Sequence, residues 1–290
     1  MIYLILSVIC STLNIINFKL FARYRVKTIQ AIVINYTVCI TVGLLAEGKL
    51  KAANEIVDSQ WFFPSILLGS LFITIFYLTA MTVKYSGVAV TSIAGKLSLI
   101  IPTIAAYFLY GDIFNFLKIA GICIAVLAIF FTVYKKDEPG GTPISFQYYL
   151  FPLLILTGNG IIDTLAKYNQ ENYVEPEDFN FFLVFVFGTS ALMGWVILLI
   201  RKILYHENLQ LKSIVAGISL GIPNYGSMYF LIQALEKSGL ASSTFFPVNN
   251  ICVVLLSCLC AWLLFKEKLN VLNVIGIFLS VFAIVLIMLS

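Results

Sequence analysis

Long apolar runs constrain this chain more than any other feature of its sequence. Each run is about 18–24 residues long, which at about 1.5 Å per residue crosses a ~30 Å hydrocarbon core. The chain is 61% hydrophobic and 11% charged, with a mean hydropathy of +1.00, whereas soluble domains are about 45–50% apolar and 25% charged. Because hydrocarbon cannot satisfy backbone groups, such runs fold as helices. The sequence therefore predicts an all-α polytopic membrane protein.

Ten spans can be placed along the 290 residues, separated by turns or polar loops. They cover residues 2–20, 29–46, 61–82, 88–110, 114–134, 147–168, 179–203, 212–235, 241–264 and 270–289. The linker with the strongest turn chemistry and charge, Lys135 to Pro143, lies at the centre of the chain. We therefore expect two five-helix units, residues 1–136 and 145–290.

The second unit repeats a pattern of the first. The matching positions are Ser86-Gly87 and Ser238-Gly239, Asp112 and Glu267, and Gly121 and Gly276. An odd number of spans per unit places the second unit upside down in the membrane. The sequence therefore predicts ten transmembrane helices as an inverted 5+5 repeat, with a substrate site near the midplane between the units.

Lys96 is the most informative single residue because it lies about nine residues inside the fourth span. A charge at that depth costs about 2.5–3.5 kcal/mol, so it should face a cavity or a partner. Thr103 lies on the same helical face. The alternative is a snorkelling or salt-bridged lysine that holds helices together.

Other polar side chains lie at comparable depths in the first, third, eighth and ninth spans. With Lys96, the candidate substrate-binding residues are Asn249, Asn250, Tyr77, Tyr229, Asn224, Asn14 and Thr103. The asparagines would bond a solute and the tyrosines would pack on it. Asparagines at this depth also bond between helices, and tyrosines also pack, so helix packing is the alternative.

Asp163 is the one acid well inside a span. Any coupling of transport to protons would depend on it or on Lys96, and Lys167 follows it on the same helical face. Asp163 and Lys167 are therefore candidates for proton coupling. The alternative is that they form a structural pair one helical turn apart.

Several function classes are disfavoured. All six cysteines lie inside apolar runs, where they act as small buried hydrophobes, so we expect neither disulfides nor a metal site. The one histidine, His206, lies in a loop, and motifs of enzymes and cofactor sites are absent. A net charge of +4 with no basic cluster gives no indication of nucleic-acid binding. We expect no cleavable signal sequence and no cofactor.

The partners that this composition predicts are the lipid bilayer and a small-molecule substrate, with the chain a monomer or a weak homodimer. A receptor or a non-transporting accessory membrane subunit is the alternative from another class. In that alternative, the polar faces only hold helices together.

A turn glycine, a long span with a central proline, a short acidic turn and a glycine nine residues later resemble the EamA-like branch of the drug/metabolite transporter superfamily. In the first copy these are Gly87, Pro102, Asp112 and Gly121. Asn14 followed by Lys19 also fits, although Ser11-Thr12 replaces the usual tryptophan-glycine pair. The resemblance implies a ten-helix transporter in a bacterial inner membrane, usually an exporter of amino acids, metabolites or drugs. An importer or facilitator of metabolites such as sugar-linked solutes is the alternative.

The orientation in the membrane stays open. Twelve Lys and Arg follow the odd-numbered spans, against five on the other side. The twelve are Lys19, Arg23, Arg25, Lys27, Lys84, Lys135, Lys136, Arg201, Lys202, Lys212, Lys266 and Lys268. The positive-inside rule then places both termini outside, whereas the family resemblance implies cytoplasmic termini.

Overall fold

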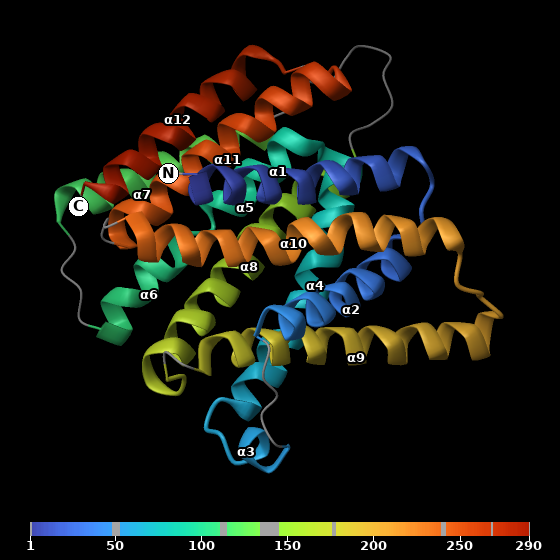
Figure 1. Cartoon of the computed structure of the whole chain (residues 1–290). Helices are drawn as coiled ribbons and strands as arrows, with labels where there is room; N and C mark the ends of the chain where they lie inside the picture. The colour runs from blue at the N-terminus through green and yellow to red at the C-terminus, as the bar shows by residue number, and fades with distance from the viewer. Residues whose placement is uncertain are drawn as a thin grey trace.

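The computed structural model describes residues 2–47, 53–110, 115–133, 145–175, 178–238, 242–267 and 269–289, and is all-helical over them. The helices are α1 (Ile2–Arg23), α2 (Thr28–Glu47), α3 (Ala53–Val57), α4 (Phe62–Ser86), α5 (Val88–Leu97), α6 (Ile100–Tyr110), α7 (Phe116–Val133), α8 (Phe146–Asn172), α9 (Phe179–Tyr205), α10 (Leu211–Ser238), α11 (Ser242–Phe265) and α12 (Val271–Met288). The two chain ends lie on the same side of the molecule (Figure 1). The predicted central linker, Asp112 and Gly239 lie outside the described residues.

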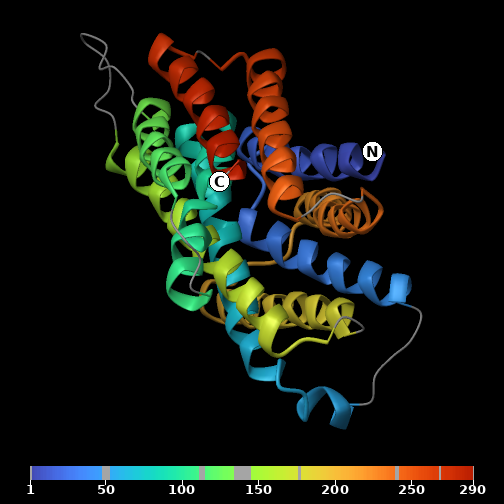
Figure 2. The ribbon, with the colours of Figure 1, turned by 90° about the vertical axis from the view of Figure 1, so that its left-hand side faces the viewer.

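Each predicted span coincides with a helix, but the fourth is divided into α5 and α6. The polar loop before the third span holds the short helix α3, which lies at one end of the bundle (Figure 2) and packs Ile56 against it. Within the described ranges, 8 helices are long and apolar enough to cross a membrane. The apolar part of α7, Phe116–Thr132, is shorter, and α10, which carries several polar and charged residues, is not among the eight. The chain is a multi-pass membrane protein.

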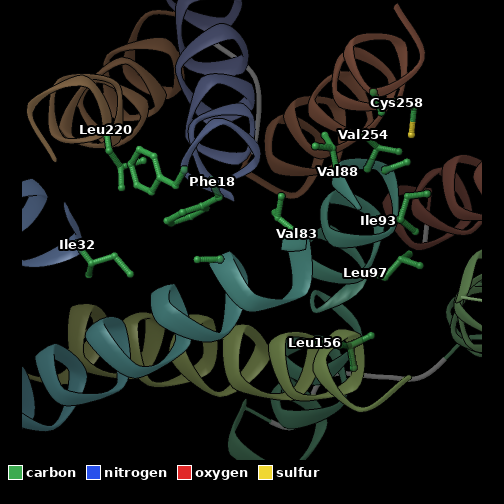
Figure 3. Close-up of a cluster of buried hydrophobic side chains, with 14 of the residues drawn as sticks. Phe18, Ile32, Val83, Val88, Ile93, Leu97, Leu156, Leu220, Val254 and Cys258 are labelled. Carbon is green, nitrogen blue, oxygen red and sulfur yellow. The ribbon is translucent and has the colours of Figure 1, made fainter. Parts of the chain in front are cut away.

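The largest buried cluster draws side chains from both halves of the chain (Figure 3). Phe18 of α1 lies between Leu220 of α10 and Val83 of α4, while Val88 of α5 lies near Val254 of α11. The two halves therefore share one core. The three buried clusters among the described residues each contain side chains from both halves.

Helices α7 and α12 approach closely at two glycines, one from each half. A Cβ atom at Gly121 would lie 2.7 Å from Ile287 Cγ1, and one at Gly276 would lie 2.7 Å from the backbone nitrogen of Thr132. The residues involved, paired at a constant separation of 155 in the sequence, are Gly121 and Gly276, Ala128 and Ala283, and Thr132 and Ile287. Each half thus offers the other the same contact.

The same exchange recurs where α4 packs on α9 and α10 packs on α2. A Cβ atom at Gly69 would lie 2.6 Å from Thr189 Cβ, and one at Gly221 would lie 2.7 Å from Val38 Cβ. Gly69 and Gly221 are 152 positions apart in the sequence, and the residues that they contact, Val38 and Thr189, are 151 positions apart. These glycines allow the backbones to approach closely, which is how helices associate in a membrane.

One hydrogen bond between the halves also occurs twice, with the roles of the two halves reversed. The hydroxyl of Ser190 donates to the carbonyl of Gly69 at 2.8 Å, and the thiol of Cys39 donates to the carbonyl of Gly221 at 3.6 Å. Cys39 and Ser190 are 151 positions apart, like the other members of this contact. A thiol in one half therefore occupies the place of a hydroxyl in the other.

Replacing Gly276 by alanine should destabilise the protein by about 1–3 kcal/mol, because the new methyl group would collide with Thr132 and force α7 and α12 apart. Gly188→Ala is the matched control, since nothing lies within 4 Å of a Cβ atom there. That control should leave stability unchanged or raise it by up to about 1 kcal/mol through helix propensity. Thermal unfolding in detergent measures both variants. Equal stability of the two would contradict close packing at Gly276.

The loop after α9 is tied to the start of α2 by charged side chains. Glu207 accepts from Lys27 at 3.0 Å and from Arg201 at 2.9 Å, while Gln30 donates to the carbonyl of Asn208 at 3.0 Å. The hydrogen bond from Lys27, assisted by the charge of Arg201, holds the pKa of Glu207 below its usual value. These contacts therefore stabilise the fold while Glu207 is ionised.

Replacing Glu207 by glutamine should lower stability at neutral pH, because Lys27 and Arg201 lose their shared anion. A carboxylate whose folded pKa is depressed contributes stability above its unfolded pKa of about 4.3 and loses that contribution as pH falls through the folded value. The difference between parent and Glu207→Gln should therefore shrink below about pH 4. Thermal unfolding across this range tests it. A difference independent of pH would assign the loss to packing instead of charge.

Candidate functional site

The fourth predicted span is broken near its middle by a proline. Pro102 has no N–H to donate, and its ring crowds the carbonyl of Ser98 four residues earlier. Accordingly α5 ends at Leu97 and α6 begins at Ile100, whose neighbour Ile101 bonds the carbonyl of Ser98 at 3.0 Å. A broken helix inside a membrane exposes backbone groups at depth, where transporters place their binding sites.

Lys96 and Asp163 both lie beside this break. Lys96 lies in the last turn of α5 and is partly buried, and its charge interacts with that of Asp163 on α8. The hydroxyl of Ser98 lies 3.4 Å from Asp163 Oδ2. Asn159, one turn before Asp163, lies against Gly95, where an added Cβ atom would be 3.5 Å from its amide nitrogen. The sequence singled out Lys96 and Asp163 separately, and the structure places Asp163 against Ser98, two residues after Lys96.

A second group consists of buried polar atoms that have no hydrogen-bond partner in the part of the chain that the structure describes. It includes Asn14 Oδ1 on α1, Ser92 Oγ on α5, and Asn249 Oδ1 and Ser257 Oγ on α11. These three helices pack against one another. Leaving a buried polar atom unpaired costs about 1–3 kcal/mol. Such atoms are available to water or to a polar solute.

The other candidate residues have different surroundings. The amide of Asn224 donates to Asn35 Oδ1 at 3.1 Å, which joins α10 to α2 as the packing alternative predicts. The hydroxyl of Thr103 donates to the carbonyl of Leu99 at 2.7 Å, beside the break. Asn250 is partly buried next to Asn249.

The two tyrosines and Lys167 are more exposed. Tyr77 is 39% exposed and Tyr229 is 42% exposed, the latter stacked on Tyr225 with ring centroids 6.2 Å apart. Lys167 pairs with Glu171 at 3.7 Å, one turn further along α8.

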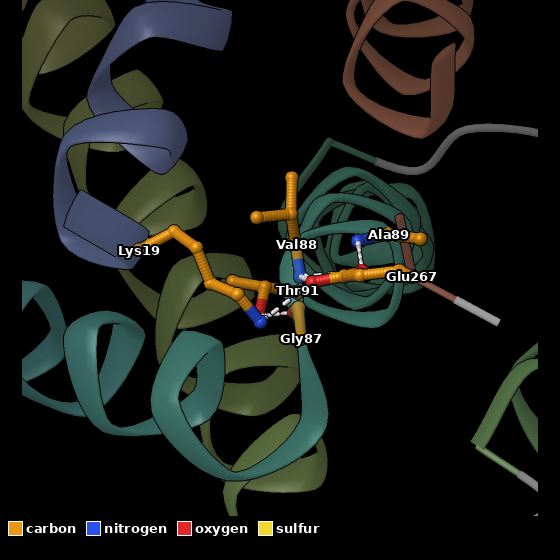
Figure 4. A network of polar contacts seen from close by, with 6 residues as sticks. All are labelled: Lys19, Gly87, Val88, Ala89, Thr91 and Glu267. Carbon is orange, nitrogen blue, oxygen red and sulfur yellow. Dashed lines mark hydrogen bonds and ion pairs between the residues drawn. The ribbon is translucent and has the colours of Figure 1, made fainter. Parts of the chain in front are cut away.

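A clasp that the sequence did not reveal joins the two halves of the chain (Figure 4). Glu267 accepts from Lys19 of α1 at 2.8 Å and from the backbone N–H groups of Val88 at 3.0 Å and Ala89 at 3.4 Å. The carboxylate thus caps the start of α5, where an anion is favoured by the helix dipole. Gly87 turns the chain there with φ 92°, and a Cβ atom on it would lie 2.9 Å from the carboxylate.

A strained residue at the end of α11 directs Glu267 toward α5. Lys266 has φ 50°, a left-handed conformation that costs a residue other than glycine about 1–2 kcal/mol. Its N–H bonds the carbonyl of Trp262 at 3.1 Å, and the N–H of Glu267 bonds the carbonyl of Ala261 at 3.0 Å. The sequence signal was the recurrence of an acid in both repeats, which gave no indication of its partner.

The comparisons with known proteins agree with this architecture. Residues 147–289 match the EamA-like transporter family. The match confirms the resemblance seen in the sequence, is consistent with the drug/metabolite transporter superfamily, and suggests a membrane transporter.

Two further similarities extend over nearly the whole chain. An uncharacterized protein of Haemophilus influenzae is 27% identical over 285 residues, covering 97% of this chain and 95% of the relative. A solved crystal structure, 16% identical, gives a TM-score of 0.58 over 97% of this chain and 95% of that one. The latter likeness shows a shared fold.

Replacing Glu267 by glutamine should destabilise the protein by about 1.5–3 kcal/mol, the range for hydrogen bonds to a charged group. The side chains of Lys19 and Glu267 are only 29% and 15% exposed, so solvent screens them weakly. Glu171→Gln is the matched control, since its pair with Lys167 is about half exposed and worth less than about 1 kcal/mol. Thermal unfolding of the two variants in detergent gives the comparison. A similar small loss in both would show that the clasp contributes little.

Proposed function

We propose that this protein exports small organic solutes, amino-acid-like or drug-like, across a bacterial inner membrane. Transport would proceed by alternating access about a site between two inverted halves. The observation that carries the proposal is the contact of Ser98 with Asp163 at a helix break inside a membrane span, two residues after Lys96. Charges at that depth are costly unless they serve a cavity or a partner.

The exchanged contacts support the inverted repeat. In a two-fold arrangement, a contact between residues of the two halves recurs with the roles reversed. The glycine contacts of α7 with α12, and of α4 and α10 with α9 and α2, recur in this way. Rocking of one half against the other about a midplane site is the motion that such architecture favours.

The chemistry of the site suits a solute that carries both charges. Without a solute, Lys96 and Asp163 attract each other. A zwitterion would replace each partner by its own carboxylate and ammonium groups, keeping both charges paired. Asn14 and Asn249 supply unpaired carbonyl oxygens for further bonds. Tyr77 and Tyr229 would pack on the solute when the halves close, and Asp163, with Lys167, would carry any coupled proton.

Import or facilitated movement of the solute would use the same site. The alternative from a different class is a non-transporting accessory subunit. In that alternative every polar side chain in the bundle would bond a neighbouring helix, as Asn224 bonds Asn35. Access of water-soluble reagents to Lys96 separates the two.

A cysteine at position 96 tests the site in a background without the six native cysteines. Cys39→Ser is suited to that background because Ser190 makes the equivalent bond in the other half. We expect a membrane-impermeant thiol reagent to label Lys96→Cys, because the site opens to water on one side. Leu97→Cys, at a fully buried neighbouring position, should not react, and Tyr24→Cys, 65% exposed at the end of α1, should react fully.

Transport is measured in parallel with radiolabelled amino acids in proteoliposomes. Asp163→Asn and Lys96→Gln should each reduce flux at least tenfold, since each leaves the other charge unpaired in the membrane. Protection of Lys96→Cys by a transported amino acid would support the proposal. Absence of labelling from either side, in a folded protein without flux, would favour the accessory subunit.

A further inference from the structure

A cavity of about 550 Å³ lies beside the clasp, at the ends of α1, α4 and α11. It is separate from the helix break and from the unpaired polar atoms, none of which line it. The residues that define its chemistry are the cations Lys19, Arg23, Lys84 and Lys266 and the apolar Leu264 and Phe265. Four cations around one cavity repel one another unless an anion lies between them.

The protein itself supplies only part of the negative charge that would balance these four cations. Glu267 pairs with Lys19, whereas Arg23 and Lys266 meet no acidic partner in the part of the chain that the structure describes, and Lys84 lies over the ring of Tyr85 at 5.3 Å. Three helices end here, each offering about half a negative charge, and α5 begins here with about half a positive one. Arg23, Lys84 and Lys266 are exposed to solvent, so this excess of cations gives the cavity a positive potential.

Lys266 adds an independent observation. It occupies a left-handed backbone position, φ 50°, that glycine would occupy without strain. A glycine would also cap α11 and direct Glu267 toward α5, so the cap alone does not account for a lysine. The side chain, in contrast, places a cation on the cavity wall.

We propose that this cavity binds a phosphate group, carried by a free anion or by a phospholipid headgroup. Inorganic phosphate at neutral pH carries about one to two negative charges and the phosphodiester of a lipid headgroup carries about one, and both have several acceptor oxygens for the excess of cations in the cavity. Arg23 offers a planar fork to two oxygens, and Lys84 and Lys266 offer point charges. Leu264 and Phe265 give the cavity an apolar wall continuous with a membrane helix. The proposal does not depend on the transport function.

Binding is tested with the full-length protein purified in detergent and titrated with inorganic phosphate against chloride at matched ionic strength. Lipid binding is tested by native mass spectrometry after reconstitution in equal parts phosphatidylcholine and phosphatidylglycerol. We expect Arg23→Gln and Lys266→Gly each to weaken binding about fivefold, the effect of removing one cation near an anionic group. Lys266→Gly should remain folded because glycine relieves the strained backbone.

Two controls match these variants. Lys202→Gln removes a cation from the last turn of α9, and His206→Gly changes another left-handed residue, φ 50°; neither residue lines the cavity. Phosphate binding lost only in the cavity variants identifies a free anion as the ligand. Retention of phosphatidylglycerol over phosphatidylcholine, lost in the same variants, identifies a headgroup. No binding of either, or equal loss in Lys202→Gln, overturns the proposal.

Discussion

Close approach of helix backbones at glycines is the constraint on which the rest of this structure depends. In a bilayer the lipid tails are as apolar as leucine, so burying apolar side chains drives association less than it does in water. Packing between backbones takes its place. Gly69, Gly121, Gly221 and Gly276 each lie where a Cβ atom would collide with a helix of the other half. The largest buried cluster contains side chains from helices of both halves that meet this closely.

Much of the fold could be predicted from the sequence, because apolar runs report membrane spans directly. The sequence also predicts the turn at Gly87, the depth of Lys96 in its span and the presence of an acid, Asp163, inside a span. The sequence does not predict which helices pack against each other. The pattern of residues along one helix indicates how deep a side chain lies and on which face, but not which helix lies opposite. Lys19 and Glu267 lie 248 positions apart, and only the fold places them 2.8 Å from each other.

Asn224 is a second residue whose neighbouring helix could not be predicted from the sequence. Its depth and polarity made it a candidate for a cavity, yet its amide binds Asn35 on a neighbouring helix. Asn249 is as deeply buried, and its carbonyl oxygen has no hydrogen-bond partner among the described residues. Nothing in the local sequence distinguishes the two, because the difference lies in which helix is opposite. The division of the fourth span was signalled by Pro102, although a proline inside a helix also occurs without a break, as Pro152 does in α8.

The exchanged glycine contacts have a consequence for a chain of half this length. Each half carries both members of every exchanged contact, the glycine and the surface that receives it. Two copies of one half, inserted in opposite directions, would therefore present to each other the same grooves and ridges that the halves now share. Joined in one chain, the two halves need not be identical, and Cys39 and Ser190 differ at one such bond.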